Sequence, residues 1–446
     1  MAELQDSSSS PKLKQTLGPL MLWGLGVGYV ISGMYFGWNI GLEKGGTLGL
    51  AIATFFIIIM YVTFTFSYTE LACAIPKAGG AFDYADRGLG KNMGFIAGIA
   101  QIVEFVFAPP AIALAIGAYF HLSFPQFDTI AIAIVAYLIF TGLNIYGVKA
   151  AASFELIITI LAVGELLLFT GATMPEFQFE NLKQNALPNG VEGIFAAIPF
   201  AIWFFLAIEG VANVAEETIN PQRNVLIGFG SAILTLVVLC LLTFSSSVGV
   251  AGWEAIVFPV GSETASDSPL PLALGRVVGE NAFLYELLIT IGLFGLIASF
   301  HGIILAAGRA TFEFGRVGYA PRFLGKVQKK FRTPANALII NMVVGIIALL
   351  TGKTGEIITI ACFGALSLYI ISMITFFSLR KKEPDMPRPF KVPMYPVFPA
   401  LALTIAVVAL IAMTVYNLML GAIYFGFVSA SFIAFKMFYK EEAKVV

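Results

Sequence analysis

The chain has 446 residues, of which 58% are hydrophobic and only 12% carry a charge. A soluble domain of this length could not bury so much apolar surface, so the composition indicates a protein that crosses a membrane many times. The formal net charge of −1 at pH 7 is too balanced to suggest nucleic acid as a partner. Three cysteines, Cys73, Cys240 and Cys362, lie far apart in apolar runs. We expect buried thiols, and neither a disulfide framework nor a metal site.

Twelve apolar runs are long enough to span a bilayer as helices. The preceding residues are polar and lack both an apolar core and a cleavage site, so we expect a cytoplasmic tail and not a signal peptide. The sequence therefore predicts an all-α polytopic membrane protein with tails at 1–16 and 439–446. The predicted spans are 17–42, 48–75, 92–119, 128–147, 151–173, 191–214, 224–250, 283–311, 334–352, 356–378, 397–417 and 419–438.

Lysine and arginine are distributed unevenly among the segments that connect these spans. If the N-terminal tail lies inside, the inner segments carry 22 of them and the outer segments carry four: Lys44, Lys183, Arg276 and Lys353. Because positively charged loops stay on the cytoplasmic side, both termini are expected in the cytoplasm. The longest outer loop, about 251–282, is acidic and rich in Ser, Gly and Pro. We expect it to carry little structure of its own.

Two spans contain weak points at corresponding places. In the first span, close helix packing would explain Gly24 and Gly28, although glycine costs about 1 kcal/mol in a helix interior relative to alanine. For Ile31–Met34 we predict an unwound turn whose free backbone groups line a site. The sixth span has a comparable weak point at Ala207–Gly210. Interruptions five helices apart are typical of an inverted five-plus-five repeat. The predicted repeats are 17–173 and 191–378, followed by two extra helices in 397–438.

Three glutamates lie deep in predicted spans, Glu104, Glu165 and Glu209, whereas no lysine or arginine does. A carboxylate at mid-span costs roughly 2.5–3.5 kcal/mol on insertion scales and is tolerated where it faces a cavity or an ion path. A cavity with only negative groups attracts an amine, a metal cation or H⁺. Structural hydrogen bonding remains an alternative for Glu104 and Glu165. Glu155 is expected to be a solvated or interfacial residue at a helix end, and His301 a packing residue whose polar atoms have partners.

Motifs along nearly the whole chain resemble the amino acid–polyamine–organocation superfamily of transporters. They are Tyr68-Thr69-Glu70-Leu71, Ile75-Pro76-Lys77-Ala78-Gly79-Gly80 with Tyr84, Asn144-Ile145-Tyr146-Gly147-Val148-Lys149, Glu216-Glu217 with Asn220-Pro221 and Arg223, Gly308-Arg309 with Gly318, Pro321 and Thr333-Pro334, and Pro387-Arg388-Pro389-Phe390 with Pro393. Within that superfamily, LWGLGVGYVISGMYFGWN and QIVEFVFAPPAIALAIGAY are most similar to bacterial ethanolamine permeases. The resemblance implies a leucine-transporter-type fold, which holds its substrate between the broken first and sixth helices and the third and eighth.

The resemblance also implies roles for single residues. Trp203 falls where arginine–agmatine exchangers have a gating tryptophan, and Glu209, six positions later, falls where they have an acidic, proton-sensitive residue. The Ser32-Gly33 turn falls where amino acid members bind a carboxylate through backbone N–H groups. Some proton-coupled members have a lysine in the fifth helix. The best match here is Ala162, so coupling through a lysine is not expected.

Ethanolamine is a small primary ammonium with one hydroxyl, so its site needs a negative seat, an aromatic wall and a hydroxyl partner. We expect Glu209 and freed carbonyls to seat the ammonium, aromatic rings to enclose it, and Ser32 or Ser299 to bind the hydroxyl. Glu104 would be a second carboxylate. The proton-coupling candidates are Glu104, Glu165 and Glu209. The candidate substrate-binding residues are Ile31, Ser32, Gly33, Tyr35, Glu104, Trp203, Phe204, Phe205, Ile208, Glu209 and Ser299.

The leading hypothesis is a secondary active transporter that imports ethanolamine across a bacterial cytoplasmic membrane by alternating access, proton-linked or by exchange. We expect such a transporter to need no cofactor or metal and to be surrounded by membrane lipid. An amino acid permease or amine–amino acid exchanger is the alternative, with the Ser32-Gly33 amides binding a carboxylate. A channel is a further alternative. The sequence has no His cluster, no Gly-x-Ser-x-Gly and no phosphate loop outside a span, so we expect no enzyme.

Overall fold

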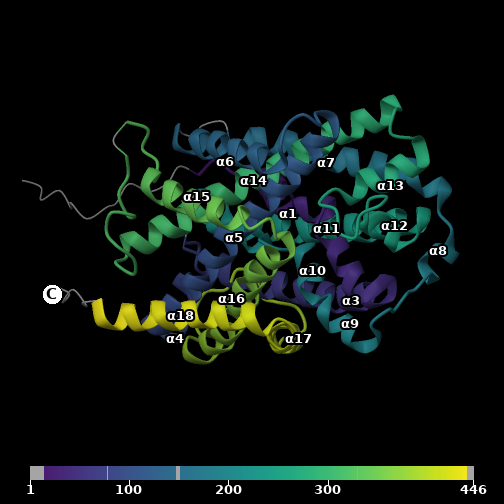
Figure 1. Cartoon of the computed structure of the whole chain (residues 1–446). Coiled ribbons are helices and arrows are strands. Elements are labelled where there is room, and N and C mark those ends of the chain that lie inside the picture. Colours follow the sequence, from purple (N-terminus) through teal and green to yellow (C-terminus); the bar gives the residue numbers. More distant parts are fainter. Residues whose placement is uncertain (1–14, 78, 147–150, 329, 439–446) are drawn as a thin grey trace, which may run out of the picture.

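The computed structural model is a bundle of long helices (Figure 1), and it describes residues 15–77, 79–146, 151–328 and 330–438. Within these residues, ten helical segments are long and apolar enough to cross a membrane. They are α3 (Trp38–Ala74), α5 (Lys91–Ser123), α6 (Thr129–Tyr146), α7 (Ala151–Thr173), the run formed by α9 (Gly190–Ala196), α10 (Ile198–Trp203) and η2 (Ile208–Glu217), α11 (Pro221–Ala251), α14 (Phe283–Arg316), α16 (Thr354–Lys382), α17 (Val397–Tyr416) and α18 (Leu418–Phe438). The all-α polytopic prediction is confirmed.

The count of twelve spans stays a prediction, because two predicted spans are short or divided. The first is split into α1 (Pro19–Val30) and the pieces that follow it, and the ninth is the 15-residue helix α15 (Ala335–Leu349). Most of both predicted tails lies outside the described residues, as do Ala78 and the Gly147-Val148-Lys149 part of one family motif.

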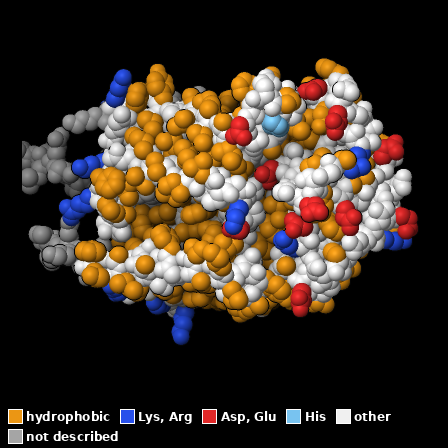
Figure 2. Space-filling view, in the orientation of Figure 1, with side chains coloured by type: hydrophobic (Ala, Val, Ile, Leu, Met, Phe, Trp, Pro, Cys, Tyr) orange, Lys and Arg blue, Asp and Glu red, His pale blue; other side chains and the backbone are white. Residues whose placement is uncertain are grey.

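Basic and acidic side chains gather at opposite ends of the molecule, and apolar side chains cover the flank between them (Figure 2). Large apolar residues that are exposed include Leu138 of α6, Ile347 of α15 and Phe427 of α18. An apolar belt between two polar ends suits a protein whose lateral surface lies in lipid. We refer below to the basic end and the acidic end. Which of them faces the cytoplasm stays a prediction.

The first predicted span is interrupted before it crosses the bundle. The helix α1 stops before Ile31, as expected, and the single turn α2 (Ser32–Tyr35) follows. The backbone leaves the helical conformation only later, at Phe36, which is extended, and at Gly37, which has φ 86°. Glycine adopts positive φ readily, whereas other residues rarely do. The predicted unwound turn at Ile31–Met34 is therefore corrected: most of it is helical, and the chain unwinds where Gly37 permits it.

The second interruption lies where the sequence predicts it. α10 ends at Trp203, and Ala207 takes a left-handed conformation with φ 74°. That conformation costs a non-glycine residue of order 1–3 kcal/mol and tends to occur at functional sites. The next ten residues, η2, form a 3₁₀ helix, which is unusually long for this helix type. The weak point predicted at Ala207–Gly210 is confirmed, and the irregular backbone extends well beyond it.

The two interrupted helices are tied to each other at the basic end. The backbone N–H of Leu17 donates to the carbonyl of Glu217 at 3.0 Å, and the N–H of Ile219 donates to the carbonyl of Leu17 at 2.9 Å. Arg309 of α14 adds an ion pair with Glu217 at 3.1 Å. The start of α1 and the end of η2 are thus joined, and α14 is fastened to both.

The loop between α11 and α14 carries more structure than expected. It contains α12 (Trp253–Val257) and α13 (Pro269–Val278). The prediction of an unstructured loop is wrong because Pro269 is well placed to begin a helix, and Leu270 and Leu274, four residues apart, both become buried.

Candidate functional site

Two glutamates from different helices meet in the centre of the bundle. Glu104 of α5 and Glu209 of η2 are both fully buried. The hydroxyl of Tyr369, on α16, lies 2.9 Å from Oε2 of Glu209 and 3.4 Å from Oε1 of Glu104. The backbone N–H of Ala207 donates to the same Glu104 oxygen at 3.1 Å. Glu104 therefore holds the left-handed residue at the helix break, and Tyr369 connects both acids to α16.

Each carboxyl has one oxygen without a donor. Glu104 Oε2 and Glu209 Oε1 are buried and accept no hydrogen bond from the described residues, and the two carboxyls lie close enough to interact electrostatically. Two carboxylates cannot donate to one another, and a buried polar atom without a partner is costly. A proton on one carboxyl, or a cation between them, would supply the missing donor. The carboxyl pair can therefore bind either a proton or a cationic group.

A chain of phenols continues from the carboxyl pair. The hydroxyls of Tyr369 and Tyr61 lie 3.2 Å apart, and Tyr61 reaches the carbonyl of Ile202 at 3.5 Å. Buried tyrosines usually find such partners for their hydroxyls. Tyr61 and Tyr369 were not among the residues predicted from the sequence. The available signal was a phenol inside a run without charged residues, as in FGALSLYIISM.

Three aromatic residues lie at the break and are buried, so none of them faces lipid. The ring of Trp203 packs edge-on against Phe36 at 5.4 Å between centroids, and its indole N–H has no acceptor among the described residues. Phe204 stacks on Trp38 at 5.7 Å. Phe205 packs on Tyr61 at 5.3 Å. A Cβ at Gly37 would meet the indole, so Trp203 sits directly between the two interruptions.

Two serines form hydrogen bonds at the first helix interruption. Ser32 Oγ donates to Ser299 Oγ at 2.8 Å, and Ser299 Oγ donates to the carbonyl of Tyr29. In a continuous α-helix that carbonyl would accept from the N–H of Gly33. The structure brings Ser32 and Ser299 together, as the hypothesis requires, but in this arrangement their hydroxyls bind each other and the backbone. Ile31 and Ile208 are fully buried beside the two breaks, and Gly33 lies against the carbonyl of Trp203.

Tyr35 and Glu165 belong to a separate cluster. The Tyr35 hydroxyl donates to the carbonyl of Ala162 at 3.1 Å, and the Tyr119 hydroxyl donates to the carbonyl of Tyr35 at 3.0 Å. Glu165 lies beside the Tyr35 hydroxyl. A Cβ at Gly295 would meet the Tyr35 ring, which therefore packs on α14. Among the described residues, Tyr35 contacts α5, α7 and α14 through these hydrogen bonds and this packing, and it does not contact the carboxyl pair.

The prediction that Glu155 is a solvated or interfacial residue at a helix end is wrong. Glu155 is only 2% exposed, and its Oε2 lies 3.6 Å from Nδ1 of His301. The reason is the glycine-rich face of α1: a Cβ at Gly28 would meet both Glu155 and Thr159, and Thr159 donates to the carbonyl of Gly24 at 3.2 Å. Small residues let α7 approach α1 closely enough to cover the acid. His301 is buried as a packing residue would be, but its Nδ1 has no hydrogen-bond partner among the described residues, and its acidic neighbour was not foreseen.

Comparison with known proteins agrees with this architecture. The family model described as amino acid permease matches residues 17–435. An uncharacterized transporter of Rhizobium meliloti is 28% identical over 84% of this chain and 80% of its own length. The branched-chain amino acid permease BcaP of Bacillus subtilis is 28% identical over 89% of this chain and 88% of its own. The low-affinity putrescine importer PlaP of Escherichia coli is 25% identical over 84% of each. The chain belongs to the amino acid permease family.

Proposed function

We propose that the protein imports ethanolamine, or a primary amine of similar size, as a secondary transporter that works by alternating access. Transport of amino acids or amines is supported by the family and by the relatives, whose names include both kinds of cargo. The choice of an amine rests on the Glu104–Glu209 pair. Each of its carboxyls has a buried oxygen without a donor, and no lysine or arginine lies at the middle of a predicted span to neutralise them.

An ammonium group satisfies this pair better than a proton does. It carries three N–H donors and a full positive charge, so it can reach Glu104 Oε2 and Glu209 Oε1 together. A proton shared between Glu104 Oε2 and Glu209 Oε1 would occupy the same two oxygens, so the pair releases that proton when the ammonium takes its place. Binding of the amine and release of the proton are then linked. Trp203, Phe204 and Phe205 surround the break and provide the aromatic wall.

The irregular backbone supports movement at the same place. Ala207 is held left-handed by its hydrogen bond to Glu104, and η2 is a long 3₁₀ helix. A change in the charge of Glu104 alters that hydrogen bond, and so alters the geometry of the break. We propose that this is how occupancy of the site reaches the moving helix segments, with Trp203 closing one side.

An amino acid is the second candidate cargo. The Ser32–Gly33 turn lies against the carbonyl of Trp203 at the other break, so a carboxylate bound there would be close to an ammonium at Glu209. The permease BcaP, which aligns with 89% of this chain, is named for branched-chain amino acids. An amino acid cargo carries a carboxylate that this turn would bind, whereas ethanolamine carries none.

Uptake of labelled ethanolamine into proteoliposomes tests the proposal. We expect saturable uptake that unlabelled ethanolamine abolishes and that excess leucine or glycine leaves nearly unchanged. Counterflow should be present, which a channel does not give. Strong competition by the amino acids, together with their own uptake, would instead identify the chain as an amino acid permease. Putrescine in the same panel measures how large an amine the site accepts.

A further inference from the structure

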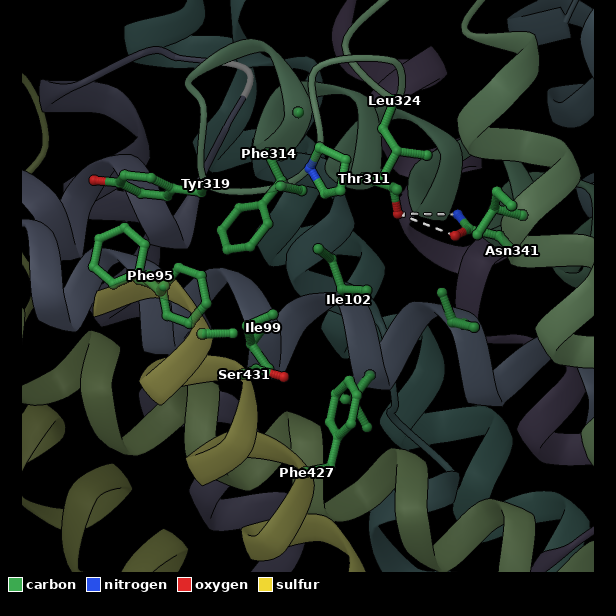
Figure 3. A pocket seen from close by; sticks show the side chains of 18 of the residues that line it. Phe95, Ile99, Ile102, Thr311, Phe314, Tyr319, Leu324, Asn341, Phe427 and Ser431 are labelled. Carbon is green, nitrogen blue, oxygen red and sulfur yellow. Dashed lines mark hydrogen bonds between the residues drawn. The ribbon is translucent and has the colours of Figure 1, made fainter. Parts of the chain in front are cut away.

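A large apolar groove lies on the flank of the bundle, and neither Glu104 nor Glu209 is among its lining residues. Figure 3 shows it from close by: α5 supplies Phe95, Ile99 and Ile102, and α18 supplies Phe427 and Ser431. Its volume is about 1380 Å³, which exceeds the range of about 300–1,000 Å³ usual for small-molecule sites. Between α15 and α18 the apolar surface is hollowed (Figure 2). The groove is therefore suited to a long ligand that enters from the side.

The interior of the groove offers almost no unsatisfied polar group. Thr311 of α14 and Asn341 of α15 line it, but they bind each other: Thr311 Oγ1 and the Asn341 amide are joined at 3.1 and 3.2 Å. The remaining walls are largely aliphatic or aromatic. The outer rim is exposed, with Ile423 and Phe427 each 52% exposed. The part of a ligand that fills this space must be apolar.

One end of the groove is basic. Lys91 begins α5, Arg316 ends α14, and Arg322 lies in the following loop; all three line the groove and are exposed. Glu313 pairs with Arg316 at 2.6 Å, and Lys91 and Arg322 also have interaction partners, so a bound anion would compete with existing contacts of all three side chains. The groove thus runs from a mouth lined by basic side chains, at the basic end of the molecule, into the apolar belt.

We propose that this groove binds an anionic phospholipid of the surrounding bilayer. The phosphate lies at Lys91, Arg316 and Arg322, and an acyl chain lies along α5 and α18. Basic pockets between membrane helices attract anionic headgroups, and the apolar length behind the mouth matches a hydrocarbon chain. Inorganic phosphate would use only the mouth, and a zwitterionic lipid would gain little from the charges. The combination favours a lipid that is both anionic and long.

The lipid would act on the helix that carries Glu104. On α5, Ile99, Val103 and Val106 line the groove, and the helical repeat of 3.6 residues places Glu104 on a different face of the same helix. A lipid seated in the groove supports α5 from outside while Glu104 contacts the break from inside. This inference does not depend on which cargo is carried.

Native mass spectrometry of the full chain in detergent tests the proposal, with phosphatidylglycerol and phosphatidylcholine of identical chains added at equal concentration. We expect at least fivefold more retained phosphatidylglycerol. The combined variant Lys91→Gln, Arg316→Gln, Arg322→Gln should remove this preference. The matched control Lys183→Gln, Arg276→Gln, Lys353→Gln removes three positive charges elsewhere and should keep it. Ser431→Trp, which fills the groove, should reduce retention of both lipids.

Equal retention of the two lipids by the unmodified chain would overturn the proposal, as would an unchanged preference in the charge variant. Retention unaffected by Ser431→Trp would place the lipid elsewhere. If the unmodified chain is a dimer and Ser431→Trp dissociates it, a second copy of the chain occupies the groove. If a variant fails to fold, hydrogen exchange of the unmodified chain in nanodiscs decides: greater protection of α15 and α18 in phosphatidylglycerol than in phosphatidylcholine supports the site, and equal protection refutes it.

Discussion

The hydroxyl of Tyr369 lies 2.9 Å from Oε2 of Glu209, and this contact joins the middle of α16 to the broken helix. The same hydroxyl lies within reach of Glu104 and of Tyr61. A single proton donor therefore stands between two acids, one of which also fixes the backbone at Ala207.

Replacing Tyr369 with phenylalanine removes that donor and keeps the ring, which packs on Phe64 at 4.3 Å. The substitution leaves a buried carboxylate oxygen without its hydrogen bond, so we expect a loss of about 1–3 kcal/mol in unfolding free energy and a changed pH profile of uptake. Thermal unfolding and uptake across pH measure the two effects. Tyr146→Phe, at an exposed tyrosine, is the control and should change neither. An unaltered pH profile would remove Tyr369 from the coupling network.

Glu104→Gln tests whether Glu104 carries the coupling proton. Glutamine keeps an oxygen that can accept from Ala207, so the break should persist, but the side chain no longer titrates. We expect retained amine binding with a flat pH dependence. Glu165→Gln, in the separate Tyr35 cluster, is the comparison. If the flat profile appears there and not in Glu104→Gln, the coupling site lies on α7.

Near the basic end, Glu70 links the Tyr68-Thr69-Glu70-Leu71 motif to the Pro387-Arg388-Pro389-Phe390 motif. It pairs with Arg380 at 2.7 Å and with Arg388 at 3.2 Å, and it accepts from the N–H of Val392 at 2.8 Å. Glu70→Ala leaves two cations uncompensated, one of them deeply buried. We expect a loss of about 3–5 kcal/mol in unfolding free energy, seen as a lower midpoint in thermal unfolding.

The control for Glu70 is Glu356→Ala, which breaks an exposed pair with Lys353. Exposed pairs contribute about 0–1 kcal/mol, so its midpoint should hardly move. Equal effects of the two substitutions would show that burial does not strengthen the Glu70 network.

Asp267, in the loop at the acidic end, makes this region pH-dependent. Burial raises the pKa of Asp267 from 3.8 to about 6, although a hydrogen bond from Thr354 acts in the opposite direction. A raised pKa means that the folded loop prefers the protonated acid, so the stability that Asp267 contributes is full below pH 3.8 and is lost as pH rises through about 6. Hydrogen exchange in α13 should therefore be faster at about pH 7 than at about pH 5, after correction for intrinsic exchange. Asp267→Asn should abolish the difference, and a difference that survives in this variant has another source.

The sequence predicted the parts of the fold that depend on composition and on isolated special residues. Apolar length identified the helical bundle, and a glutamate beside glycine inside an apolar run identified the break at Ala207. The position of the first break was misjudged, because several glycines in α1 could have supplied the positive φ and only packing selects Gly37. Cys73, Cys240 and Cys362 are free and buried, as expected.

The candidate site was predicted less completely, because contacts between helices depend on helix rotation. Glu104 and Glu209 could be named from their charge and depth, but their common partner Tyr369 lies on α16, far away in the chain. Tyr35 was predicted to help enclose the ammonium, but its ring packs on α14 and its hydroxyl reaches α7. Glu155 was assigned to solvent by its position in the span, whereas the small residues of α1 bring a neighbouring helix over it.

The central claim is that Glu209 seats a positively charged nitrogen. Isothermal titration of ethanolamine into the detergent-purified protein, at several pH values, tests it with Glu209→Gln and with Glu356→Gln as a matched control at an exposed acid. We predict that Glu209→Gln weakens binding at least tenfold, which corresponds to about 1.4 kcal/mol, while the control binds normally. Near-normal affinity of a folded Glu209→Gln protein at every pH would contradict the account.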